Sequence, residues 1–347
     1  MSAQAAMTYS KAGVSIAAGD ELVRRIGPIA RRTAIPGVLA AVGGFSALFD
    51  LSRLGYRKPV LVSSTDGVGT KLKVAFLTGI HDTVGIDLVA MSVNDLVTQG
   101  ARPLFFLDYF VCGKLDVDIA TAVVRGIAEG CRQAECTLIG GETAEHPGDF
   151  PSGEYDLAGF IVGVIEKDRV LNPRAVSAGD ILIGIPSSGL HSNGYSLARK
   201  VLLERGRLKL QQRIPDLGSK LGEELLAPTR IYAKLARRLF EKFSIKGAAH
   251  ITGGGITGNL PRILPQGKRA VIERGSWPVP PIFGLIQKIG QVAQNEMDAT
   301  FNNGIGMILV VAKKDASGVL KALARSGERA FTIGEIRKGQ RGVSLVS

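Results

Sequence analysis

The stretch Val60-Leu61-Val62-Ser63-Ser64-Thr65-Asp66-Gly67-Val68-Gly69-Thr70-Lys71 decides the fold that this sequence predicts. An apolar, β-branched run ends at an acidic residue, and an apolar pattern resumes after the lysine. This order predicts a strand, a tight loop and a helix. The two glycines let backbone N–H groups approach an anion, and Lys71 adds a positive charge. Asp66 can hold a divalent cation that bridges phosphates. The spacing is not that of a Walker A loop, and an ordinary turn after a strand explains the same residues.

Composition predicts a folded protein of two domains with an anionic partner. The chain has 347 residues, of which 45% are hydrophobic and 21% charged, which excludes global disorder. The net charge of +12 indicates an anionic partner. Lysines and arginines are scattered and form no basic block with aromatic residues. Nucleic acid stays open as a partner, and phosphorylated small molecules explain the charge equally well.

The cysteines and the apolar runs predict a cytoplasmic protein. Cys112, Cys131 and Cys136 are few and lack the spacing of metal ligands, which favours buried, reduced thiols. The N-terminus has no basic region followed by an apolar core, and no apolar run is long enough to cross a bilayer.

Residues 84–100 predict a helix with one unusual polar face. Apolar residues supply most of its bulk, whereas Asp87, Asn94 and Asp95 recur at helical spacing together with Met91 and Thr98. A solvated face normally carries Lys and Glu, and none occurs here. We therefore expect this face to line a site.

A third carboxylate follows a second strand-and-glycine pattern. Residues 136–143 read as a short strand, a glycine pair and Glu142. Oxygen-only ligation suits magnesium, so Asp66, Asp95 and Glu142 are candidate Mg²⁺ ligands.

The residue pattern of the sequence changes near residue 168, and we place the domain boundary there. The two predicted domains are therefore 1–168 and 169–347. In the second domain, residues 186–197 and 248–262 read as strand, polar or glycine-rich loop and helix, a pattern that suits an anion. N-capping by Ser192 or Asn193 explains the first loop without a ligand. His191 is a candidate for an acid–base group or for a hydrogen-bond donor to phosphate. His250 fits a half-buried histidine with its hydrogen bonds satisfied as well as it fits a catalytic one.

Six motifs together resemble the phosphoribosylformylglycinamidine cyclo-ligase (aminoimidazole ribonucleotide synthetase) family of purine biosynthesis. The similarity runs from about residue 9 to residue 311 and beyond. The motifs are TDGVGTK at 65–71, the 85–100 helix, FFLDY at 105–109, GGETAE at 140–145, GLHSNGY at 189–195 and HITGGG at 250–255.

The resemblance implies a fold and an activity. The implied fold is an α/β (α+β), two-domain synthetase: the N-terminal sheet pairs with that of a partner to form a barrel across a homodimer, and the C-terminal domain is α/β. The implied enzyme is an ATP-dependent ligase that closes formylglycinamidine ribonucleotide to aminoimidazole ribonucleotide and releases ADP and phosphate. ATP and Mg²⁺ are the implied cofactors, and no nucleic acid or membrane partner is implied.

The resemblance also assigns site residues, in four groups. The catalytic candidates are His191, Lys71 and Asp95. The ATP-binding candidates are Asp66, Gly67, Gly69, Thr70, Lys71, Asp87 and Asn94. The substrate-binding candidates are Ser188, Gly189, His191, Ser192, Asn193, Thr252, Gly253 and Gly254. The metal candidates are Asp66, Asp95 and Glu142.

Four positions depart from the usual family pattern. Ser15 stands where the arm commonly has Asp, Lys11 is displaced by one position, and Ala299 and His146 replace a common arginine and methionine. These departures leave open the role of the N-terminal arm and the site near Phe301. Sister enzymes of the superfamily are the alternative. The absence of a cysteine before Cys112 disfavours selenophosphate synthetase, and thiamine-monophosphate kinase is expected to match fewer motifs.

Overall fold

Residues 59–78 fold as a strand, a short turn of helix and a longer helix. Strand β3 spans Pro59–Gly67, the 3₁₀ turn η2 spans Gly69–Lys71, and α2 spans Leu72–Thr78. The predicted order is confirmed, but Asp66 and Gly67 are the last residues of the strand rather than part of a loop. The computed structural model describes residues 6–346; residues 1–5 and 347, the outer ends of the two predicted domains, lie outside the described residues.

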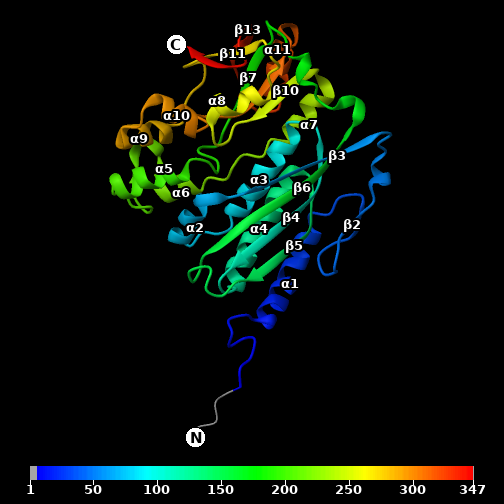
Figure 1. Ribbon diagram of the computed structural model, residues 1–347, viewed down its shortest axis with the longest axis vertical. Coiled ribbons are helices and arrows are strands. Elements are labelled where there is room, and N and C mark those ends of the chain that lie inside the picture. Colours follow the sequence, from blue (N-terminus) through cyan, green and yellow to red (C-terminus); the bar gives the residue numbers. More distant parts are fainter. Residues whose placement is uncertain (1–5, 347) are drawn as a thin grey trace.

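A four-stranded sheet forms the first half of the molecule, in the order β3-β6-β4-β5 (Figure 1). β6 is antiparallel to both β3 and β4, whereas β4 and β5 are parallel and are joined by helix α4. The bounds of this half are α1 Ile16–Arg31, β1 Val38–Ala40, β2 Leu48–Phe49, α3 Val84–Val97, β4 Arg102–Cys112, α4 Val117–Ala134, β5 Thr137–Glu145 and β6 Tyr155–Glu166. The glycine pair predicted to follow a short strand, Gly140 and Gly141, lies within β5.

Helices α3 and α4 cover one face of this sheet and touch each other closely (Figure 1). A Cβ atom on Gly85 would overlap the backbone of α4, and one on Gly126 would overlap the backbone carbonyl of Asp82. Only glycine at these positions permits this separation of the two helices. The helix-facing side chains of the sheet, such as Phe106 and Ile161, are fully buried.

The opposite face of the same sheet is apolar and is largely uncovered by the rest of residues 6–346. Leu61 on β3, Phe160 on β6 and Tyr109 on β4 are 61%, 42% and 37% exposed. Phe160 pairs with Thr65 on one side and with Leu107 on the other, so the apolar residues form a continuous surface across three strands. A surface of this kind marks an interaction site.

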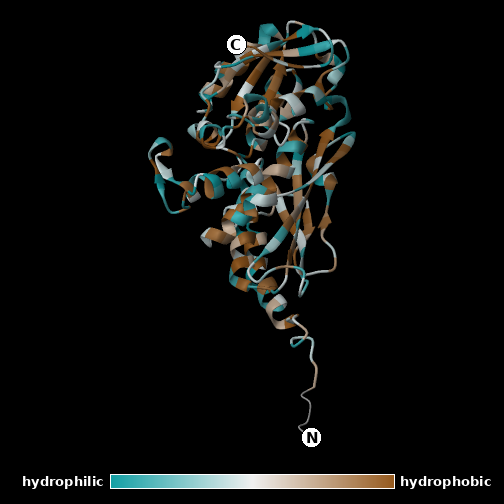
Figure 2. Cartoon of the chain, turned by 60° about the vertical axis from the view of Figure 1, so that its left-hand side comes forward, coloured by the Kyte–Doolittle hydropathy of each residue, from teal (hydrophilic) through white to brown (hydrophobic). Residues whose placement is uncertain are grey.

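A six-stranded sheet forms the second half, in the order β10-β12-β7-β13-β11-β14. Its strands are β7 Ile181–Pro186, β10 Ile245–His250, β11 Lys268–Glu273, β12 Ile305–Val311, β13 Phe331–Lys338 and β14 Gly342–Val346. Its helices are α5 Tyr195–Arg199, α6 Leu221–Leu226, α7 Ala233–Lys242, α8 Gly255–Asn259, α9 Pro281–Gly290, α10 Gln294–Thr300 and α11 Lys313–Arg325. A short hairpin, β8 Arg213–Ile214 with β9 Ser219–Lys220, lies apart from it. Figure 2 shows hydrophobic colouring along the strands of both sheets.

The two halves meet along helix α3, which lies between the first sheet and the loops of the second half (Figure 1). The three cysteines are free and buried, as the sequence predicts. Within residues 6–346, no helix combines the length and apolarity that a membrane span requires.

Candidate active site

Most of the polar face of α3 packs against the second half of the chain. Asn94 is fully buried: its Oδ1 accepts a hydrogen bond from the Tyr232 N–H at 2.9 Å, and its Nδ2 donates to the Arg230 carbonyl at 2.8 Å. Asp87, about two helical turns before Asn94, is also fully buried and accepts a hydrogen bond from the Thr229 N–H at 2.7 Å. The interpretation of this face as non-solvated is correct, but Asp87 and Asn94 face the second half of the chain rather than open space for ATP.

Lys71 is a buried cation whose donors are all engaged. Its Nζ lies 2.9 Å from Asp87 Oδ1, 3.2 Å from the His191 carbonyl and 2.7 Å from the Ala227 carbonyl. Its side chain is 0% exposed. An ammonium group has three protons, so none is left for a phosphate. This geometry does not support the predicted contact of Lys71 with phosphates, because burial and Asp87 hold the side chain inside.

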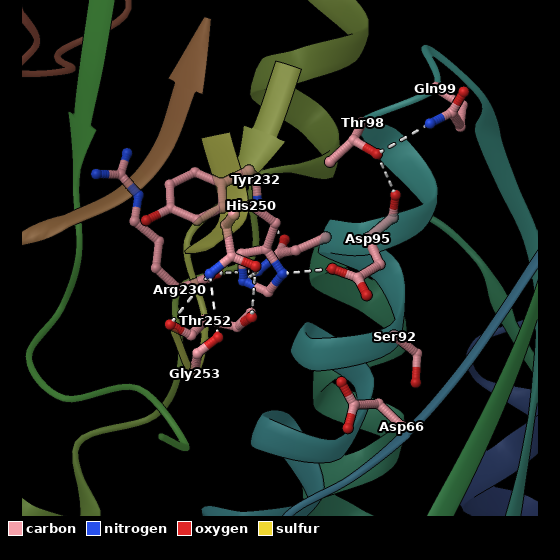
Figure 3. A network of polar contacts seen from close by, with 12 residues as sticks. Asp66, Ser92, Asp95, Thr98, Gln99, Arg230, Tyr232, His250, Thr252 and Gly253 are labelled. Carbon is pink, nitrogen blue, oxygen red and sulfur yellow. Dashed lines mark hydrogen bonds and ion pairs between the residues drawn. The ribbon is translucent and has the colours of Figure 1, made fainter. Parts of the chain in front are cut away.

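Asp95 is the residue of α3 that reaches open space. Its side chain is 44% exposed, and its Oδ1 lies 2.8 Å from Nδ1 of His250, whose side chain is 1% exposed (Figure 3). The His250 Nε2 lies 3.4 Å from the amide nitrogen of Asn94. The buried imidazole therefore holds one carboxylate oxygen of Asp95 in place, while the other carboxylate oxygen faces outward.

Asp66 lies near Asp95, at the end of β3 (Figure 3). Burial, and then the negative charge of Asp95, raise the pKa of Asp66, although the Gly67 N–H donates to its Oδ1 at 2.8 Å. Two carboxylates that repel each other beside open space form a site that a cation would stabilise. Thr70 follows on η2, and its hydroxyl lies 3.1 Å from that of Ser196 in the second half.

Glu142 does not join this pair. It lies on β5 and lines a separate cavity with Asp108 and Gly141, under α1. The Thr143 N–H donates to its Oε1 at 2.8 Å. Within residues 6–346, no three His, Cys, Asp or Glu side chains gather closely enough to hold a metal ion together. The three-carboxylate metal site is therefore not assembled within one chain.

The predicted loop at residues 188–193 is held rigidly from within. The Ser188 N–H donates to Nε2 of His191 at 3.1 Å, and the Ser192 hydroxyl donates to Asp87 at 3.1 Å. His191 is 1% exposed and adopts a left-handed backbone conformation with φ of +61°. Burial lowers its pKa well below the ordinary value, so its ring is neutral. The carbonyl of Gly189 accepts from Asn302 at 3.0 Å. A neutral, enclosed imidazole suits a positioning role better than proton transfer with a substrate.

The second glycine loop lies against the first. Gly254 has φ of +95°, which favours glycine, and a Cβ atom on Gly253 would lie 3.4 Å from Oδ1 of Asn193. The amide nitrogen of Asn193 is buried and has no hydrogen-bond partner among the residues that the structure describes. Thr252 contacts Asn259 through its hydroxyl at 3.3 Å. The structure thus brings residues 188–193 and 252–254 together, with an unused amide donor beside them.

Sequence reasoning missed several residues that build this site. Thr229 and Tyr232 dock on α3, and Asn302 holds the Gly189 loop. Thr229 and Tyr232 carry no motif, so no local pattern could have found them. The Thr-Phe-Asn-Asn-Gly run that includes Asn302 was a usable signal.

Comparison with known proteins places both halves of the chain. Residues 48–165 match the family described as "AIR synthase related protein, N-terminal domain", and residues 177–347 match its C-terminal domain. Proteins named phosphoribosylformylglycinamidine cyclo-ligase are similar over nearly the whole chain. The one from Myxococcus xanthus is 59% identical over 96% of each chain, and the one from Geobacillus kaustophilus is 54% identical over 98% of each.

Solved structures share the fold at low sequence identity. Thiamine-monophosphate kinase from Stenotrophomonas maltophilia has a TM-score of 0.67 at 20% identity, covering 96% of each chain. The hydrogenase maturation protein HypE in complex with ATP has a TM-score of 0.65 at 18% identity, covering 93% of this chain and 90% of that one. The two family matches and the nearly full-length relatives show that the chain belongs to the AIR synthase related family, and within it to the phosphoribosylformylglycinamidine cyclo-ligases.

Proposed function

We propose that the chain closes formylglycinamidine ribonucleotide to aminoimidazole ribonucleotide at the expense of ATP, releasing ADP and phosphate, as an enzyme of purine biosynthesis. The observation that carries this is family membership over nearly the whole length, at 53–59% identity to cyclo-ligases. An amide oxygen is a poor leaving group, and transfer of the γ-phosphoryl group of ATP to this oxygen releases ADP and lets the oxygen leave later as phosphate. The neighbouring amidine nitrogen then attacks the activated carbon. The protein contributes mainly positioning and charge neutralisation.

Asp95 is the residue that we assign to the amidine. Its outward oxygen accepts an N–H from the substrate and fixes the direction of the attacking nitrogen. The contact from His250 to the other oxygen, at 2.8 Å, holds the carboxylate in one orientation. His250 is therefore a positioning residue, and Asp95 the catalytic one. The catalytic roles predicted for His191 and Lys71 become positioning roles, because both side chains are buried.

The nucleotide site is assigned to the end of β3. Mg²⁺ that enters with ATP needs only one or two protein carboxylates, since phosphate oxygens and water complete its coordination. Asp66 fits that need, and the outward oxygen of Asp95 has a second lone pair for the same ion besides the one that faces the amidine, whereas Glu142 does not lie with them. Bound Mg²⁺ would neutralise charge on the phosphates. Gly67, Gly69 and Thr70 follow at the same corner, and Gly69 has φ of +66°.

The substrate phosphate is assigned to the two loops of the second half. The unpartnered amide of Asn193 lies beside Gly253, which is exposed. Ser188 and Gly189 shape the first loop, and Thr252 and Gly254 the second. An anion held by amide donors in this place leaves the amidine end of the substrate free to reach α3.

A homodimer is the assembly that the uncovered sheet face supports. Leu61, Phe160 and Tyr109 lie on one apolar surface of three strands, and pairing with a second copy would bury it. The barrel across the dimer is the arrangement that we propose. A domain boundary at 168/169, between the two family matches, and a cytoplasmic location complete the proposal.

The test is ADP release that depends on formylglycinamidine ribonucleotide. Asp95→Ala is expected to lower kcat by about 10²–10⁴ while the circular dichroism spectrum stays that of the parent. Asp216→Ala, which removes an exposed carboxylate outside the site, is the matched control. Full turnover by Asp95→Ala would refute the assignment. Turnover with thiamine monophosphate instead would point to a sister enzyme.

The dimer has its own test, the mass in solution. The parent is expected at twice the chain mass of 36.7 kDa. Phe160→Glu places a charge on the apolar face and is expected to give the monomer. Gln211→Glu, at an exposed position outside this sheet, adds the same charge and is the control. A parent that sediments as a monomer contradicts the proposed assembly.

A further inference from the structure

A cavity of about 450 Å³ lies in the second half, between α8, α9, α10 and the segment 274–281. None of the residues predicted from the sequence to bind ATP, substrate or metal lines it. Its size is within the range of about 300–1,000 Å³ that small-molecule sites occupy. It is therefore a candidate for a second ligand site, which the proposed reaction does not use.

The walls of this cavity are apolar, and two of them are aromatic. Trp277 and Phe283 are 8% and 2% exposed, and Met297 and Ile256 are also buried. The indole N–H of Trp277 donates to the Asn303 carbonyl at 2.8 Å, which fixes the plane of the ring. Aromatic rings fixed in a wall can pack edge-to-face against a planar ligand.

At the polar edge of the cavity, the charges of Arg274 and Asp298 neutralise each other. Asp298 accepts from both terminal nitrogens of Arg274, at 3.1 and 2.6 Å, and from the Gln294 amide at 3.0 Å. The Gln287 amide donates in turn to Gln294 at 2.9 Å. A guanidinium already paired with a carboxylate has little preference for a charged ligand. Two side-chain amides supply both donors and acceptors.

We propose that this cavity binds an uncharged, planar heteroaromatic ligand of the size of a nucleobase or nucleoside. The ring packs edge-to-face against Trp277 and Phe283, and its polar edge exchanges hydrogen bonds with the amides of Gln287 and Gln294. The inference goes beyond the proposed function and does not depend on it, because the site shares no assigned residue with the reaction.

Trp277 makes the test specific, since it is the single tryptophan of the sequence. Adenosine is titrated into the full-length protein, and tryptophan emission is recorded under selective excitation. We expect saturable quenching below about 1 mM adenosine. AMP, which adds two negative charges, is expected to bind no more tightly. The nucleotide site on β3 contains no tryptophan, so adenosine bound there leaves this signal unchanged.

Gly284→Leu blocks the cavity. Gly284 lies on α9, lines the cavity, and has no atom within 4 Å of the position of an added Cβ. Leucine also favours the helix, so the variant is expected to fold, and to weaken adenosine binding at least about tenfold. Gly19→Leu, at an equally open position on α1, is the control and is expected to bind normally. The proposal is overturned if adenosine leaves the emission unchanged, if Gly284→Leu binds like the parent, or if AMP binds about tenfold more tightly than adenosine.

Discussion

Lys71→Met removes one charge of a buried pair and is expected to destabilise the fold strongly. The ammonium group is 0% exposed and lies 2.8 Å from Oδ2 of Asp87, which is also 0% exposed. Methionine keeps the length and apolar stem of lysine, so the variant leaves little cavity. What remains is a buried, uncompensated carboxylate, and removal of one partner of such a pair costs about 3–5 kcal/mol.

Asp87 retains some support in that variant, which sets the magnitude toward the lower end. The N–H and the hydroxyl of Thr229 still donate to it at 2.7 and 2.6 Å, and the Ser192 hydroxyl donates at 3.1 Å. We therefore expect a loss of about 3 kcal/mol. Adding Asp87→Asn removes the orphan charge, so the double variant is expected to recover about 1–2 kcal/mol relative to Lys71→Met alone.

Urea unfolding followed by circular dichroism measures these differences. Lys73→Met is the matched control, because Lys73 lies two residues away and its ion pair with Glu154 is 44% and 26% exposed. An exposed pair contributes less than about 1 kcal/mol. Equal losses in Lys71→Met and Lys73→Met would show that Lys71 is not a buried structural cation. Unchanged stability together with a raised KM for ATP would restore its predicted role on the phosphates.

Three further predictions concern single residues. Burial raises the pKa of Asp108 to about 7 from an ordinary 3.8, so the unfolded chain loses its proton first. The contribution of Asp108 to the free energy of unfolding is therefore fully present below pH 3.8 and declines from there to about pH 7, by at most about 1.4 kcal/mol per pH unit. Urea unfolding of Asp108→Asn, measured across this pH range, should lack this decline. Gly126→Ala forces α4 away from Asp82 and should lose about 1–3 kcal/mol, whereas Gly19→Ala, with open space, should gain up to about 1 kcal/mol in the same assay. His191→Asn should raise the substrate KM by roughly tenfold and leave the pH profile of kcat unchanged, because the ring is already neutral; a displaced profile would restore acid–base chemistry at His191.

Much of the first half could be predicted because its signals are local. The β-branched run before Asp66 and the glycine that starts η2 specify a strand and a turn by themselves. The polar face of α3 was readable because its residue types are wrong for a solvated helix. What that face contacts was not readable. Asn94 meets Tyr232 across 138 residues, and periodicity carries no information about such pairings.

The candidate site shows the same division. A carboxylate at the end of a strand or on the polar face of a helix is visible in the sequence, so Asp66 and Asp95 could be named as candidates. Lys71 was misjudged because the sequence cannot show that Ala227 and His191 enclose its ammonium group. The link between Asp95 and His250 spans 155 residues and depends on how the two halves dock.

The strand order of the second sheet has a consequence for how the protein is made. β7, its first strand to be synthesised, is an inner strand whose neighbours are β12, at Ile305–Val311, and β13, at Phe331–Lys338. Both neighbours emerge from the ribosome more than a hundred residues later. The growing chain therefore carries an unpaired, apolar strand through most of the translation of this half. Closure of the sheet waits for the last segment, so we expect the risk of aggregation to be greatest in that interval.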